Sequence, residues 1–167
     1  MRLRSETSSI ERLAEIREGY RARIAREYEF RAKDCGTCET PGACCLDAHF
    51  VNVRVTRLEA RAIERVIDAL PCDLRESVIG RVDAAVDSVG TDGKFACPLY
   101  EKGTGCLVHK EAKPIPCISH ACYDTSADMP PSSLQDAAEA SIDLLNTLTY
   151  GTPQTRLPIP IAIQKVT

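Results

Sequence analysis

Four cysteines crowd into one short segment of this chain, residues 35–45, which reads CGTCETPGACC. Cys35 and Cys38 form a CxxC pair, a spacing at which two sulfurs can bind one metal ion. Cys44 and Cys45 are neighbours, and adjacent side chains diverge. This second pair is therefore better suited to two metal centres, or to two irons of one cluster. The segment predicts metal-thiolate chemistry.

A second group of four cysteines begins at residue 97 with CPLYEKGTGCLVHKEAKPIPC, and its three prolines and two glycines predict a loop. Such a loop needs a source of order, and a structural zinc-thiolate site supplies about 10 to 16 kcal/mol of apparent binding energy. The ninth cysteine, Cys72, stands alone and is expected to be an ordinary buried or half-buried residue. The candidate metal ligands are the eight cysteines of the two groups: Cys35, Cys38, Cys44, Cys45, Cys97, Cys106, Cys117 and Cys122.

Eight thiolates match two four-coordinate metal ions, or one iron-sulfur cluster with cysteines to spare. We favour an iron-sulfur cluster, serving redox, sensing or cluster-transfer work, because a pair of adjacent cysteines suits a multinuclear centre. The alternative is a structural zinc module that acts through protein-protein interaction. A disulfide network is disfavoured by the odd cysteine count and the lack of an export signal, and a thioredoxin-type CxxC by the lack of a βαβ context.

Histidines near the cysteines leave a further alternative open, a metal-dependent enzyme. His120 lies in CISHAC, where its spacing from Cys117 would permit chelation, whereas His49 and His109 are expected beside the ligands or at the surface. An enzyme would also need proton-transfer groups close to an open coordination position. The candidates for that role are Glu101, His109, Glu111 and His120.

The amino-acid composition limits which partners and which cellular compartment are expected. The net charge of −3 gives no overall electrostatic reason to expect nucleic acid. Residues 1–33 hold nine Arg or Lys against six Glu, but the mixed signs are typical of a solvated helix face. No run of 18 apolar residues and no signal-like start is present, so we expect a cytoplasmic protein without a membrane segment.

The hydrophobic patterning predicts a mainly α fold, a small single domain with a helical hairpin, two cysteine-rich metal-binding loops and little β-structure. Capping boxes are expected at Ser8 with Glu11 and at Thr56 with Glu59. The predicted segments are an N-terminal amphipathic helix (1–33), a cysteine-cluster domain (34–128) with a helical hairpin (56–89), a C-terminal helix (129–151) and an extended tail (152–167).

The hairpin matters because it returns the chain to its starting point. It should therefore bring the second cysteine group beside the first. The two ends of the chain are expected to pack on the domain, on a second copy in a homodimer, or on a protein partner. In the tail, Pro158 and Pro160 remove amide donors, which favours an edge strand or a groove.

Taken together, these motifs resemble the YkgJ-type cysteine-cluster proteins, a family described as carrying a zinc- or iron-chelating domain. The resemblance covers about residues 35–122 and is carried by CGTCETPGACC, VNVRVTRLE, CPLYEKGTGC, KPIPC and ISHAC. Lys113 stands where the family usually has Arg before Pro. The resemblance implies metal binding by the eight cysteines. A similar cysteine domain is joined to flagellin lysine methylases, but no methyl-donor site can be read in this sequence, so that activity is not expected.

Overall fold

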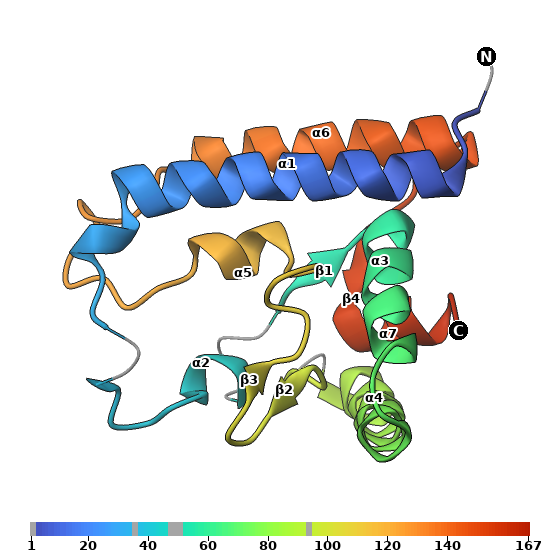
Figure 1. Cartoon of the computed structure of the whole chain (residues 1–167), viewed down its shortest axis with the longest axis horizontal. Coiled ribbons are helices and arrows are strands. Elements are labelled where there is room, and N and C mark those ends of the chain that lie inside the picture. The colour runs from blue at the N-terminus through green and yellow to red at the C-terminus, as the bar shows by residue number, and fades with distance from the viewer. Residues whose placement is uncertain (1–2, 35–36, 47–51, 93–94) are drawn as a thin grey trace. The chain divides into compact units, whose positions relative to one another are not determined.

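The computed structural model describes residues 3–34, 37–46, 52–92 and 95–167 (Figure 1). In this part of the chain most residues are helical, and the strands are short segments of two residues each. The predicted mainly helical fold with little β-structure is thus confirmed. The chain forms two compact units: the first unit is Met1–Pro41 with Pro114–Pro153, and the second unit is Gly42–Lys113 with Gln154–Thr167.

The first unit is built on two long helices that lie side by side, α1 (Glu6–Glu27) and α6 (Ser132–Tyr150) (Figure 1). A hydrogen bond of 2.7 Å joins the hydroxyls of Thr149 and Ser9, and both residues are buried. Two shorter helices complete the unit, η1 (Glu29–Arg31) and α5 (Ile115–Ser119), and α5 contacts both long helices. The apolar core comprises Leu13, Tyr20, Ile24, Ile115, Ile142 and Leu145.

The ends of the long helices follow local capping chemistry. Helix α1 begins at Glu6, because Ser5 is its N-cap and accepts a hydrogen bond from the N–H of Ser8. The capping box expected at Ser8 is therefore wrong. Helix α6 ends as predicted at Gly151, whose φ of 85° lies in the left-handed region that glycine adopts readily.

The second unit contains two small antiparallel sheets and four helices in the described residues. Strand β1 pairs with β4, with Val55 opposite Leu157, and β2 pairs with β3, with Tyr100 opposite Cys106. The bounds of the elements are α2 (Ala43–Leu46), β1 (Arg54–Val55), α3 (Arg57–Asp68), α4 (Cys72–Asp92), β2 (Tyr100–Glu101), β3 (Gly105–Cys106), β4 (Leu157–Pro158) and α7 (Ile159–Gln164).

Helix α3 starts with the predicted capping box, since Thr56 and Glu59 satisfy each other's backbone N–H groups. The prediction that α3 and α4 form an antiparallel hairpin is wrong. In Figure 1 the axis of α3 lies in the plane of the picture, whereas α4 is seen nearly end-on, so the two helices cross steeply instead of running antiparallel. Helix α7 contacts both helices, and Ile67, Val82 and Ile163 line a cavity that all three share. The apolar faces of α3 and α4 are thus covered by α7 as well as by each other.

The C-terminal tail is not the predicted extended arm. Only Leu157 and Pro158 are β-structure, and α7 follows at once. Pro160 is tolerated because it lies in the first turn of α7, where a helix does not use the missing N–H. A helix also places Ile159, Ala162 and Ile163 on one buried face. The tail therefore belongs to the core of the second unit.

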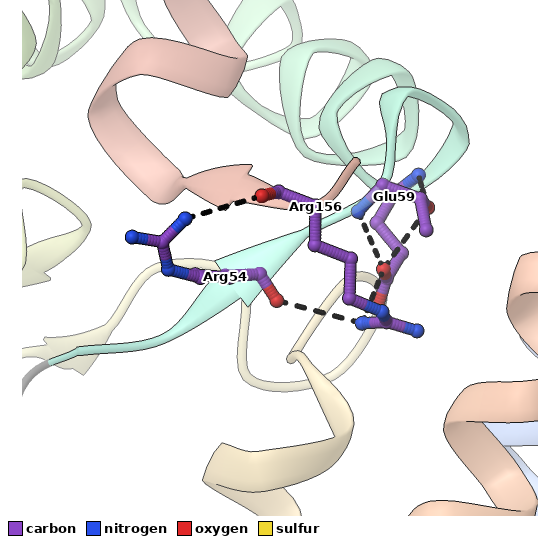
Figure 2. Close-up of polar contacts among 4 residues, drawn as sticks. Arg54, Glu59 and Arg156 are labelled. Atoms are coloured by element: carbon purple, nitrogen blue, oxygen red, sulfur yellow. Dashed lines mark hydrogen bonds and ion pairs between the residues drawn. The ribbon is translucent and has the colours of Figure 1, made fainter. Parts of the chain in front are cut away.

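A buried ion pair ties this tail to the start of α3 (Figure 2). The guanidinium of Arg156 lies 3.3 Å from the carboxylate of Glu59, whose side chain is fully buried. The same carboxylate accepts hydrogen bonds from the backbone N–H and the hydroxyl of Thr56. Arg54 and Arg156 each donate to the other's backbone carbonyl at 3.4 Å, which reinforces the short β1–β4 pairing.

No helix in the described ranges has both the length and the apolar composition required to span a membrane.

Candidate metal centre

The second unit gathers four of the eight predicted ligands from three segments. Cys44 and Cys45 lie on α2, Cys97 precedes β2, and Cys106 lies on β3. The backbone N–H of Cys97 donates a 2.7 Å hydrogen bond to the carbonyl of Cys45. Figure 1 shows α2 beside the β2–β3 hairpin. The predicted return of the chain to the CC pair is therefore confirmed.

Gly42 allows α2 to approach the hairpin closely. Its φ is +85°, and a Cβ built on it would lie 2.3 Å from the ring of Tyr100. The carbonyl of Gly42 also accepts the backbone N–H groups of Cys45 and Leu46, at 2.8 and 2.9 Å. Because Tyr100 is paired with Cys106 across the hairpin, this contact sets the position of the CC pair relative to Cys106.

Backbone donors and a cation surround the sulfur of Cys97. Burial raises the pKa of Cys97 to about 11, while hydrogen bonds from the backbone N–H groups of Leu99 and Tyr100 and the charge of Arg81 act to lower it. Arg81 is held there by its contacts with the Pro98 carbonyl and the Glu101 carboxylate, each at 3.0 Å. These donors favour the thiolate, which is the form that binds a metal.

Cys106 lies in a similar environment. Burial raises its pKa, while a hydrogen bond from the backbone N–H of Val108 and the charge of Lys113 act to lower it. Cys97 and Cys106 thus have the same arrangement, a partly buried thiol with a backbone N–H directed at its sulfur. Such N–H groups compensate the negative charge of a thiolate ligand.

Cys45 shows that the four sulfurs act on one another. Burial raises its pKa to about 12, and the neighbouring Cys44, Cys97 and Cys106 contribute because each added thiolate repels the others. In the metal-free protein the raised pKa values of Cys45, Cys97 and Cys106 keep these three thiols protonated at neutral pH. A bound cation would reverse the repulsion, so metal binding must release protons.

Among the described residues, no three His, Cys, Asp or Glu side chains are arranged as the ligands of one metal ion. The segments that carry the four thiols of the second unit are neighbours, but the four sulfurs are not arranged around one metal position. Cys44 is exposed, whereas Cys45, Cys97 and Cys106 are half-buried. Binding a metal would require these side chains to converge.

The other described candidate ligands belong to the first unit. Cys117 lies on α5 and is half-buried, while Cys38 and Cys122 are exposed. The backbone N–H of Lys33 donates to the Cys122 carbonyl at 2.9 Å, and its ammonium lies 2.7 Å from Asp124. This pairing joins the chain ahead of the CxxC segment to the chain that carries Cys122. Cys35 lies outside the described residues.

The remaining candidates are placed as follows. His120 ends α5 and is exposed, His109 and Glu111 are also exposed, and His49 falls outside the part of the chain described. Glu101 is paired with Arg81. None of these placements identifies an enzyme site.

Cys72 differs from its sequence expectation, because it is exposed instead of buried. It begins α4, and its thiol lies 3.5 Å from the carboxylate of Glu76. The first turn of a surface helix leaves such a side chain open to solvent. Cys72 belongs to neither group of candidate ligands.

Two residues that position the centre were missed from the sequence. The Pro41-Gly42 dipeptide is a turn signal that could have identified the turn at Gly42 immediately before α2. Arg81 offered no such signal, because it lies on α4 and reaches the cysteine segment only through tertiary packing.

Comparisons of this chain with protein-family models, with curated proteins and with solved structures found no match. The resemblance to the YkgJ-type proteins therefore stays a prediction based on cysteine spacing.

Proposed function

We propose that this chain is a metal-binding cysteine-cluster protein, with one centre formed by Cys44, Cys45, Cys97 and Cys106. One observation carries the proposal: the Cys97–Cys45 backbone hydrogen bond joins two cysteine groups that are far apart in the sequence. Hydrogen bonds from backbone N–H groups to the sulfurs of Cys97 and Cys106 support it. The YkgJ-type cysteine spacing points the same way.

An iron-sulfur cluster is the favoured occupant. Cys44 and Cys45 are consecutive residues of helix α2, so their side chains leave the helix about 100° apart. Two sulfurs with such different directions reach two irons of a cluster more easily than one small ion. The cluster would supply electron transfer, oxidant sensing or a cluster for transfer. We also place the protein in the cytoplasm, where thiols stay reduced.

The decisive experiment is an absorption spectrum from 300 to 700 nm of anaerobically purified protein, with iron, zinc and acid-labile sulfide counted on the same sample. We expect broad absorbance near 400 nm together with iron and sulfide. A transparent spectrum with stoichiometric zinc would instead establish the structural zinc module. Protein that carries neither metal, and binds neither after reduction and reconstitution, would refute the proposal.

Paired variants identify the ligands. Cys45→Ser should lower the metal content, because it removes one sulfur and leaves the backbone bond to Cys97 intact. Cys72→Ser is the matched control, since its thiol is exposed at the start of α4. Unchanged metal in Cys45→Ser, or loss of metal in Cys72→Ser, would show that the ligand set is wrong.

A further inference from the structure

A cavity of about 140 Å³ lies in the second unit where α3, α4 and α7 meet. Its inner wall is apolar, because Ile67, Val82 and Ile163 line it and are each at most 5% exposed. None of the lining residues is a candidate metal ligand. An apolar cavity of about 150 Å³ is large enough for a molecule the size of benzene. This cavity can therefore hold one small organic group.

At the mouth of the cavity an apolar side chain and two carboxylates are exposed together. Ile79 lines the cavity and remains 41% exposed. Asp83 follows four residues later on α4, so the two side chains lie on one face of that helix. Asp68 is the last residue of α3, where the helix dipole adds negative potential. Both aspartates are exposed to solvent.

The two aspartates carry charges that no neighbouring side chain neutralises. Within the described part of the chain, neither Asp68 nor Asp83 forms an ion pair or a side-chain hydrogen bond, and no Lys or Arg lines the cavity. Glu64, the third carboxylate of the lining, differs because it is paired with Arg61. Arg61 is held in place by donating to the Val166 carbonyl at 3.0 Å. The mouth of the cavity is therefore complementary to a cation.

We propose that this cavity binds a small primary amine in its ammonium form. The aliphatic stem would pack against Ile67, Val82 and Ile163, and the ammonium group would lie at the mouth with Asp68 and Asp83. The stem gains by leaving water, whereas the charged group remains partly hydrated, as it does in a lysine side chain that packs its stem on apolar surface. This site goes beyond the proposed metal binding and does not depend on it.

The expected affinity follows from the size of the ligand and the exposure of the charges. A molecule with so few atoms should bind weakly, with a Kd on the order of 1 mM. Because both aspartates are exposed, their attraction for the ammonium group is modest and is screened by salt. We expect the amine to bind about three- to tenfold more tightly than a neutral molecule of the same shape.

The experiment is an NMR titration of the full chain, labelled at the isoleucine δ1 methyl groups, near neutral pH and at low salt. The probe is n-butylamine, which has the stem and ammonium group of a lysine side chain. The methyl groups of Ile67, Ile79 and Ile163 should shift saturably, while those of Ile24 and Ile142 in the first unit stay in place. With the same stem, 1-butanol should bind about three- to tenfold more weakly and butyrate should not bind.

Paired variants test the role of the two charges. Asp68→Asn/Asp83→Asn should lower the affinity for n-butylamine to that for 1-butanol, because it removes both carboxylates at the mouth. Glu11→Gln/Asp136→Asn is the matched control, since it changes the net charge equally at exposed positions of the first unit. The control variant should bind n-butylamine like the wild type.

Three outcomes would overturn the proposal. They are the absence of a saturable shift at roughly tenfold above the expected Kd, equal affinities for n-butylamine and 1-butanol, and equal weakening in both double variants. If Asp68→Asn/Asp83→Asn fails to fold, the comparison of the three ligands in the wild type still decides. Metal content is measured separately, so amine binding without metal, or metal without amine binding, shows which of the two proposals has failed.

Discussion

The backbone N–H of Cys97 lies 2.7 Å from the carbonyl oxygen of Cys45 and donates a hydrogen bond to it. The bond involves main-chain atoms, so it does not depend on either thiol. Replacing a cysteine by serine should therefore remove a ligand without separating the two segments. This property makes cysteine variants a test of metal binding more than of folding.

Gly42→Ala should weaken both the fold of the second unit and its metal binding. A side chain at a φ of +85° costs about 1 kcal/mol, and the new Cβ would clash with the Tyr100 ring at 2.3 Å. Forcing this packing apart costs about 1 to 3 kcal/mol more. The measurement is the free energy of unfolding in urea, together with zinc content.

Gly103→Ala is the matched control for that substitution. Gly103 has nearly the same φ, +84°, but a Cβ there meets nothing within 4 Å. It should show only the backbone cost of about 1 kcal/mol. Equal destabilisation by the two variants would mean that the Gly42–Tyr100 contact does not position α2.

Arg81→Gln should lower the zinc affinity of the second unit. The charge of Arg81 acts to lower the pKa of Cys97, so its loss would raise that pKa further and reduce the thiolate fraction. Because Arg81 is partly exposed, we expect a loss of about three- to tenfold, measured by chelator competition at pH 7.5. Arg65→Gln, an exposed change on α3, should leave the affinity unchanged. An equal loss in both variants would argue against a local effect at Cys97.

Arg156→Met should destabilise the protein by about 3 kcal/mol, because it leaves the buried Glu59 carboxylate without its cationic partner. The double variant Glu59→Gln/Arg156→Met should recover part of this loss, since Gln can still accept hydrogen bonds from Thr56. Arg54→Met removes an exposed side chain and should cost less than about 1 kcal/mol. Urea unfolding measures all three, and a harmless Arg156→Met would show that the ion pair does not hold the tail.

The metal-free, reduced protein should lose stability as the pH rises above about 9. Burial raises the pKa of Cys97 from 9.0 to about 11, so the folded state favours the protonated thiol. The resulting stability is complete below pH 9 and is lost as the pH rises through 11. Between pH 8 and pH 10.5 the wild type should lose about 1 to 2 kcal/mol more than Cys97→Ser. Parallel pH profiles for the two proteins would contradict this assignment.

Features that depend on neighbours in the sequence were predicted well. The capping box of Thr56 and Glu59, and the end of α6 at Gly151, were both confirmed. In each case the stabilising contact lies within one turn of the chain, so the residue types nearby are sufficient. The start of α1 was misplaced for a related reason, because Ser5 competes with Ser8 as the cap.

The C-terminal tail shows where prediction from the local sequence pattern fails. Alternation of Leu157, Ile159 and Ile161 fits a strand, yet from Ile159 onward the chain forms α7 and buries Ile159 with Ile163. What decided between strand and helix was the surface offered by α3 and α4. Only the folded second unit contains that surface.

The sequence by itself determined that the protein is mainly helical and that eight cysteines fall in two groups suited to metal-thiolate chemistry. Tertiary structure alone decided which compact unit carries each of them. Cys44, Cys45, Cys97 and Cys106 belong to the second unit, whereas Cys38, Cys117 and Cys122 belong to the first. The reason is physical: sequence spacing limits which thiols can meet locally, whereas packing of distant helices determines which segments do meet.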